Sequence, residues 1–184
     1  MDYLLESYKN CPNYYEKYLS HLNDSTVQEV FAEMNSSVKS LQAKGVNIEN
    51  IGDMQDLGDT VTSDFYFGRT PPYDIQVENT NPEYLDLIFA SQWYEVYPAL
   101  AEQDQISTFA APLLWYVNDN INGIRNGTNP LKFIFLSAHE STLMVLLAAF
   151  NISYPECMRK NWEAKKAGTG KPYPNCDYPL FASQ

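Results

Sequence analysis

The segment from Lys132 to Phe150 constrains the fold more than any other part of the sequence. Residues 132–137 (KFIFLS) are β-prone and almost continuously apolar, which is typical of a strand buried on both faces of a parallel sheet. Residues 141–150 (STLMVLLAAF) follow closely and are long and apolar enough for a buried helix. A strand that leads through a tight turn into a helix predicts half of an α/β unit.

The remaining sequence contains no second segment with the pattern of a central strand. A strand needs neighbours because its backbone amides and carbonyls must be paired when they are buried. We therefore expect an α/β fold whose sheet is incomplete within these residues. The missing strands would come from the remainder of the same protein or from a protein partner.

Apolar residues at helical spacing predict four helices before Lys132. They cover residues 27–41, 51–67, 82–96 and 107–124. In the first, Asp24 or Ser25 is the expected N-cap and Gly45 lies just beyond the end; in the third, Asn81 is the cap and Pro82 lies in the first turn. Residues 68–82 are rich in turn formers and predict a loop, and residues 153–178 form a second boundary segment that is polar and rich in Pro, Lys and Gly.

The third of these helices carries an aromatic cluster formed by Trp93, Tyr94 and Tyr97, in a chain with 14 tyrosines. Aromatic side chains in this number are expected mainly in a helical core. If the protein has a partner surface, these three residues are the candidates for it.

The charge of the chain disfavours nucleic acid as a partner. Twelve Lys and Arg stand against 23 Asp and Glu, a formal charge of -11, whereas a protein that binds a phosphate backbone needs a broad positive face. No apolar run approaches the length of a membrane span, and charged residues interrupt the first 20 positions, so the sequence as given shows neither a span nor a signal peptide.

Cysteines and glycosylation sequons bear on the compartment. Cys157 and Cys176 bracket a polar, proline-containing stretch and are candidates for a disulfide that leaves Cys11 unpaired; three reduced, buried cysteines fit the spacing equally well. The N-x-[ST] pattern occurs at Asn23, Asn35, Asn126 and Asn151. Together these features favour the secretory pathway, with an extracellular, cell-surface or lysosomal location.

His139 and Glu140 follow the predicted strand at its carboxyl end, where ligands bind in α/β sheets. There an imidazole can donate a hydrogen bond to an anionic oxygen, and a carboxylic acid can protonate a leaving group. This chemistry suits the cleavage of phosphate esters. The alternative is that His139 caps the sheet edge and that Glu140 is only the first-turn acid that a helix dipole favours.

Residues 133–143 (FIFLSAHESTL) resemble the C-terminal signature of the histidine acid phosphatases, in which a strand ends in Ser-Ala-His-Asp. Asn10-Cys11-Pro12, followed by an aromatic-rich helix, is similar to the entry into that family's helical cap. Residues 178–184 resemble the stretch that leads into its next strand. The resemblance implies a mainly helical cap region with return helices over residues 1–130 and the C-terminal part of the α/β domain over residues 131–184.

By this resemblance, His139 binds the phosphate and Glu140 donates the proton to the leaving alcohol, with Glu in place of the commoner Asp, as in the family's inositol-polyphosphate phosphatases. The family's nucleophile is the histidine of an Arg-His-Gly-x-Arg-x-Pro motif, which this sequence does not contain. Its other histidine, His21, has no arginine beside it and is interpreted as a polar residue on a helix face.

Two functions follow from the resemblance. The first is an acid phosphomonoesterase that acts through a phosphohistidine intermediate and needs a nucleophile beyond these 184 residues, so that the chain alone is inactive. The second is a catalytically inactive, phosphatase-like subunit with a structural or interaction role. Neither a metal nor an organic cofactor is implied, because no cluster of histidine, cysteine and carboxylate residues has ligand spacing.

Overall fold

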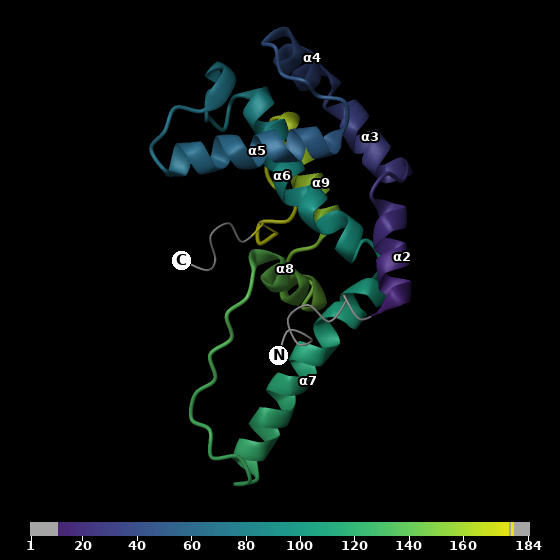
Figure 1. The fold of residues 1–184 in the computed structure, drawn as a ribbon, viewed down its shortest axis with the longest axis vertical. Helices are drawn as coiled ribbons and strands as arrows, with labels where there is room; N and C mark the ends of the chain where they lie inside the picture. Colours follow the sequence, from purple (N-terminus) through teal and green to yellow (C-terminus); the bar gives the residue numbers. More distant parts are fainter. Residues whose placement is uncertain (1–10, 177, 179–184) are drawn as a thin grey trace.

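The computed structural model describes residues 11–176 and 178, and these residues are mainly helical (Figure 1). The helices are, in chain order, α2 (Pro12–His21), α3 (Ser25–Glu33), α4 (Asn35–Ala43), α5 (Ile51–Tyr66), the 3-10 turn η2 (Pro72–Asp74), α6 (Pro82–Leu100), α7 (Gln103–Arg125), α8 (Glu140–Ala149) and α9 (Pro155–Lys166). None of the described residues forms a strand. The expectation of a helical cap-like domain is thus confirmed, whereas the expected sheet is not formed.

Helix α6 is the centre of the core, and α2, α4, α5, α7, α8 and α9 all pack against it. Phe89 of α6 stacks on Trp162 of α9 with ring centroids 4.4 Å apart, and Trp93 stacks on Tyr97 at 4.3 Å. Trp93 is only 1% exposed. The aromatic cluster predicted on this helix therefore belongs largely to the core, and Trp93 is not available as a surface for a partner.

The contact between α5 and α6 depends on a glycine. A Cβ atom at Gly58 would lie 2.4 Å from the carbonyl oxygen of Leu87, so only glycine allows this approach of the two helices. Both helices begin as the sequence predicts. The Asn50 side chain accepts hydrogen bonds from the amides of Gly52 and Asp53, and the Asn81 side chain caps α6.

The helix expected over residues 27–41 is divided into α3 and α4 at Met34, whose backbone leaves the helical region at φ -89° and ψ 0°. Asp24 is the N-cap of α3 and accepts a hydrogen bond from the Val27 amide. The change of direction at Met34 allows Ser37 of α4 to donate a hydrogen bond to Asp86 of α6, at 2.7 Å. The helical spacing of the apolar residues over 27–41 was therefore predicted correctly, but these residues belong to two helices instead of one.

Two helix boundaries differ from the prediction. Helix α7 begins four residues earlier than expected, because Gln105 and Glu102 form a capping box there. Helix α9 lies in the polar segment 153–178, in which no helix was predicted. Its composition is polar, but Cys157, Met158 and Trp162 are buried against the core. Tertiary packing thus stabilises a helix that the composition alone does not indicate.

The C-terminal half of α7 extends away from the other helices, and residues 131–139 return to α8 as a long extended segment (Figure 1). Phe133 and Phe135 are each 78% exposed, while Ile134 and Leu136 are half-buried beside Tyr116 and neighbouring residues of α7. No main-chain hydrogen bond joins residues 132–138 to the other described residues. The strand expected over residues 132–137 is therefore not formed among the described residues, which supply no strand to pair with it.

No helix within the described residues is both long and apolar enough to cross a membrane.

Candidate functional site

His139 and Glu140 lie at the start of α8, as the sequence predicts. His139 is the N-cap, and its carbonyl oxygen accepts hydrogen bonds from the amides of Thr142 and Leu143 at 3.1 and 3.4 Å. Glu140 is the first helical residue, where the positive end of the helix dipole favours a carboxylate. Both residues are exposed. The described part of the chain therefore presents them to solvent and does not enclose them in a pocket.

Glu140 interacts electrostatically with Asp59 of α5 and Glu95 of α6. Desolvation raises the pKa of Asp59, with further increases from the charges of Asp56 and Glu140, while a hydrogen bond from Ser91 opposes them. Desolvation also raises the pKa of Glu95, again with the charge of Glu140 adding to it. The start of α8 therefore lies in a locally negative environment.

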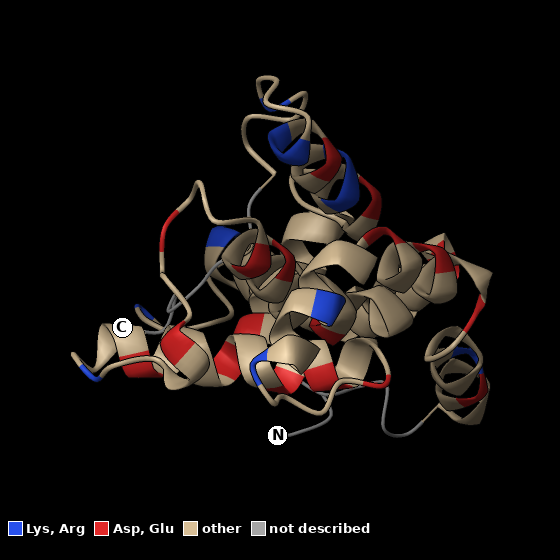
Figure 2. Ribbon diagram, turned by 90° about the horizontal axis from the view of Figure 1, so that it is seen from above, with Lys and Arg blue, Asp and Glu red and all other residues tan. Residues whose placement is uncertain are grey.

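Tyr178, the last described residue, belongs to the same environment. Desolvation raises the pKa of its phenol, and the charges of Glu140, Glu95 and Asp59 raise it further. Within the described residues, no lysine or arginine is paired with His139 or Glu140. Red acidic positions outnumber blue basic ones over the ribbon in Figure 2.

The start of α8 offers a hydrogen-bond donor in His139 and a carboxylic acid in Glu140. The described residues around it supply neither a nucleophile nor a cation for a phosphate. A phosphate monoester dianion would be repelled by the carboxylates near Glu140 unless arginines were added to the site. The neighbours Asp59 and Glu95 were not found from the sequence. They lie 81 and 45 positions before Glu140, and no local spacing connects them to it.

His21 lies elsewhere, at the end of α2. Its Nδ1 is 2.9 Å from Asp24 Oδ2 and its Nε2 is 3.1 Å from Glu102 Oε1, and its ring meets the ring of Tyr97 edge to face. The side chain thus connects α2 with the starts of α3 and α7. It has a structural role at a helix junction, and no arginine is paired with it among the described residues.

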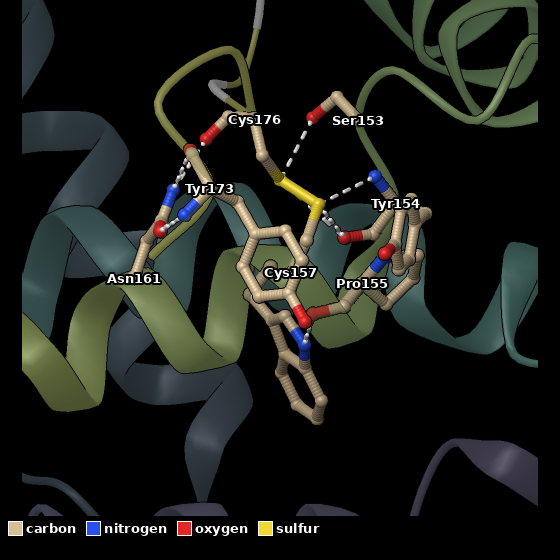
Figure 3. The surroundings of a disulfide bond; sticks show 8 residues. Ser153, Tyr154, Pro155, Cys157, Asn161, Tyr173 and Cys176 are labelled. Carbon is tan, nitrogen blue, oxygen red and sulfur yellow. Dashed lines mark hydrogen bonds between the residues drawn. A yellow bond between two sulfur atoms is a disulfide. The ribbon is translucent and has the colours of Figure 1, made fainter. Parts of the chain in front are cut away.

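The structure places Cys157 and Cys176 at disulfide distance, with Cα atoms 6.2 Å apart, as predicted (Figure 3). Asn161 donates hydrogen bonds to the carbonyl oxygens of Tyr173 and Cys176 at 2.8 and 2.9 Å, so it holds the same segment against α9. Cys11 is a free, half-buried cysteine. A disulfide is compatible with an oxidising secretory or extracellular compartment.

The four asparagines of the glycosylation sequons are exposed, and they occupy different local structures. Asn23 lies between α2 and α3, Asn35 begins α4, Asn126 caps the end of α7, and Asn151 follows α8 with a positive φ of 55°. Glycosylation at these positions stays a prediction.

The described residues contain no group of three or more His, Cys, Asp or Glu side chains that could hold a metal ion. Asn10 and residues 179–184, which contribute to the family resemblance, lie outside the described residues. Comparison with protein-family models, with curated proteins and with solved structures gives no match. The resemblance to the histidine acid phosphatases therefore depends on the quoted residues of this sequence alone.

Proposed function

We propose that these residues are the helical cap and the proton-donor segment of a histidine acid phosphatase-like phosphomonoesterase. The observation that carries the proposal is the extended segment 131–139. Its side chains are apolar on both sides, its backbone from 132 to 138 makes no main-chain hydrogen bond to the described residues, and it ends at His139 and Glu140. A segment of this kind suits a strand whose sheet neighbours lie beyond the described residues.

In the proposed reaction, a histidine from an Arg-His-Gly-x-Arg-x-Pro segment attacks phosphorus, and the bond from phosphorus to the ester oxygen breaks. Glu140 protonates that oxygen, and His139 donates a hydrogen bond to a phosphoryl oxygen. Water then cleaves the phosphohistidine and releases inorganic phosphate. The negative environment of Glu140 requires that the arginines of the added segment neutralise the substrate.

The test joins the chain to a segment that carries this motif, taken from the coding sequence upstream if it is present there. The chain alone is expected not to hydrolyse p-nitrophenyl phosphate at acid pH, whereas the joined protein hydrolyses it. Hydrolysis by the chain alone that is lost in His139→Ala would contradict the proposal.

A pair of substrates tests the role of Glu140. An alkyl alcohol needs a proton to leave, whereas p-nitrophenolate leaves readily without one. Glu140→Gln in the joined protein is therefore expected to reduce the hydrolysis of an alkyl phosphate by about 10²–10⁴-fold and that of p-nitrophenyl phosphate much less. Equal losses for both esters would exclude Glu140 as the proton donor.

The second candidate function is an inactive, phosphatase-like subunit that serves in an assembly. The acidic surroundings of Glu140 favour it, because the charges of Asp59 and Glu95 oppose the binding of a phosphate anion. An upstream coding sequence without the Arg-His-Gly-x-Arg-x-Pro motif, together with a stable complex that lacks phosphatase activity, would support this second function.

We also propose passage through the secretory pathway, with an extracellular, cell-surface or lysosomal destination. The paired Cys157 and Cys176 and the four exposed sequon asparagines support it. Expression of the natural gene with a C-terminal tag, followed by fractionation and glycosidase treatment, tests this location. A tagged protein found only in the cytosol without glycans would exclude it.

A further inference from the structure

A cavity of about 380 Å³ lies at the end of α8 opposite to His139 and Glu140. It is lined by residues of α3, α6, α7, α8 and α9 and by the turn that follows α8. With a rise of 1.5 Å per residue, the two ends of α8 are separated by about 14 Å. The cavity is therefore distinct from the proposed phosphatase site, and its volume is in the range of small-molecule pockets, roughly 300–1,000 Å³.

The walls of this cavity combine apolar and neutral polar groups. Leu100, Ile106 and Ala148 are buried apolar residues of its lining. Tyr97, which is half-buried and stacks on the buried Trp93, adds aromatic surface, and the exposed side chain of Gln103 adds an amide. Such a lining suits a molecule that has apolar ring faces as well as hydroxyl and amide groups.

The one cationic side chain of the lining is already neutralised. Arg159 donates hydrogen bonds from Nη2 to Glu33 at 2.7 Å and from Nε to Glu163 at 2.8 Å, and Glu29 lies 3.6 Å from Nη1. Glu156, also in the lining, pairs with Lys160 at 3.1 Å. An anionic ligand would have to compete with these carboxylates, so the cavity favours an uncharged occupant.

Asn151 lies in the lining of this cavity and is exposed. Its left-handed backbone ends α8, where the amide of Ile152 donates a hydrogen bond to the Leu147 carbonyl at 2.8 Å. Asn151 is also the first residue of the sequon Asn151-Ile152-Ser153. A glycosylation acceptor therefore stands beside a cavity whose chemistry suits a sugar.

We propose that this cavity holds the first N-acetylglucosamine of a glycan attached to Asn151. The pyranose ring and the acetamido methyl group would contact the aromatic and apolar walls, and the hydroxyls would face Gln103. The inference needs passage through the secretory pathway, but it does not depend on phosphatase chemistry.

Attachment is the ordinary transfer from a lipid diphosphate-linked oligosaccharide. The Asn151 side-chain nitrogen forms a bond to C1 of the sugar, the bond from C1 to the diphosphate oxygen breaks, and the amide proton leaves with the lipid diphosphate. The oligosaccharide donor is supplied by the secretory host, so no oxidant or reductant is needed.

The first experiment measures occupancy and protection together. The chain is secreted from a eukaryotic host behind a fused, cleavable signal peptide, and glycan release by a peptide N-glycosidase is followed by peptide mass spectrometry. The Asn151 glycan is expected to be present and to be released at least about tenfold more slowly from the native protein than from the denatured protein. An unmodified Asn151, or equal rates of release, would overturn the proposal.

Asn126 provides a matched control on the same chain. It lies at the far end of α7, about 30 Å along the helix axis from Ile106 of the cavity. Asn151→Gln is expected to lower the melting temperature of the secreted protein by more than that of protein from a bacterial host, which carries no glycan and in which only the left-handed backbone of Asn151 is disturbed. Asn126→Gln is expected to leave the melting temperature unchanged in both. A decrease of the same size in bacterial Asn151→Gln would assign the effect to the asparagine itself and overturn the proposal.

The binding of a free sugar tests whether the cavity is already filled by the glycan attached to Asn151. N,N′-diacetylchitobiose is titrated into the bacterial chain and into the secreted chain while tryptophan fluorescence is recorded. Saturable binding is expected only for the bacterial chain, because the secreted chain has its cavity filled by its own glycan. Equal binding by both chains, or binding by neither, would contradict the proposal.

Discussion

The helical body and the projecting arm of this protein differ in how their apolar side chains are covered. The body comprises residues 12–113 and 140–166, and the arm comprises residues 114–139. In the body, Phe89 is 6% exposed and stacks on Trp162. In the arm, Phe135 is 78% exposed and Trp115 is 67% exposed. The body therefore buries most of its apolar side chains within the described residues, although a few such as Phe67 are exposed, whereas the large apolar side chains of the arm are mostly exposed or only half-buried.

The largest expected difference in stability between the body and the arm comes from replacing one phenylalanine by alanine in each region. Phe89→Ala should reduce the free energy of unfolding by about 4 kcal/mol, because it removes a buried ring and leaves a cavity. Phe135→Ala should change it by less than about 0.5 kcal/mol, because the ring contacts mainly solvent. Urea denaturation followed by circular dichroism measures both. If Phe135→Ala reduced the free energy of unfolding by more than about 2 kcal/mol, the arm would be packed in solution. The distinction between the body and the arm would then not hold.

A second test concerns the buried carboxylate of the body. Asp86 is 1% exposed, accepts hydrogen bonds from Ser37 and, at 2.9 Å, from Trp162, and forms an ion pair with Lys166 at 3.1 Å, so it joins α4, α6 and α9. Asp86→Ala should cost about 3 kcal/mol, because it leaves buried donors without an acceptor.

The matched control for Asp86 is Asp119→Ala in the arm, where the carboxylate is exposed. It should change the free energy of unfolding by less than about 0.5 kcal/mol. Similar losses in the two variants, measured by urea denaturation, would mean that the Asp86 network does not stabilise the body.

The contrast between the body and the arm also explains how much of the fold could be predicted from the sequence. The cores of α5, α6, α7 and α8 were predicted from apolar periodicity and from caps such as Asn81, which are local signals. Helix α9 was missed because its polar composition hides five buried positions, among them Met158 and Trp162, that only packing against α6 reveals. The pattern of residues 132–137 indicated a strand, but a strand also needs a neighbour, and the pattern does not say where that neighbour is.

The candidate site shows a similar limit. The start of α8 at His139 and Glu140 was predicted because a turn between two apolar segments is a local feature. The acidic surroundings that Asp59 and Glu95 create were not predicted, because three separate helices bring these carboxylates together. The Cys157–Cys176 pair was one of two interpretations of the cysteine spacing, and the Cα separation of 6.2 Å in the structure favours the pair over three reduced cysteines.

The disulfide is expected to have the third largest effect and to act on the body. It closes a loop over 19 positions and ties the chain at Cys176 to α9 (Figure 3). Its removal in Cys157→Ala/Cys176→Ala should cost about 2.5 kcal/mol. Thermal unfolding is measured with and without a reductant. The reductant should lower the melting temperature of the original chain and leave that of the double variant unchanged; a chain that is insensitive to reductant would contradict the pairing.

A smaller, pH-dependent effect is expected where α2 and α3 meet. Burial alone would raise the pKa of the Asp24 carboxyl, but hydrogen bonds from His21, the Val27 amide and Tyr97 outweigh it and lower this pKa. A carboxyl with a lowered pKa in the folded state stabilises above its unfolded pKa of about 3.9 and loses this contribution as the pH falls through the folded value. Asp24→Asn, which keeps the cap, should therefore cost about 1 kcal/mol at pH 7 and less below about pH 4. A cost that stays constant from pH 7 to pH 2.5 in urea titrations would show that the charge of Asp24 contributes nothing.

The smallest effect on stability is expected in the arm, and hydrogen exchange makes it measurable. The amides of residues 132–138 make no main-chain hydrogen bonds to the described residues, so they should exchange at nearly the rate of an unstructured peptide. Exchange of the amides in the middle of α6 should be slower by about a thousandfold or more. Joining the chain to the segment that carries the nucleophile motif should slow exchange at residues 132–138, because new strands would pair with them. Slow exchange at these residues in the chain alone would mean that the arm already has a partner, for instance a second copy of the chain. In that case, protection from exchange would increase with protein concentration in a concentration series.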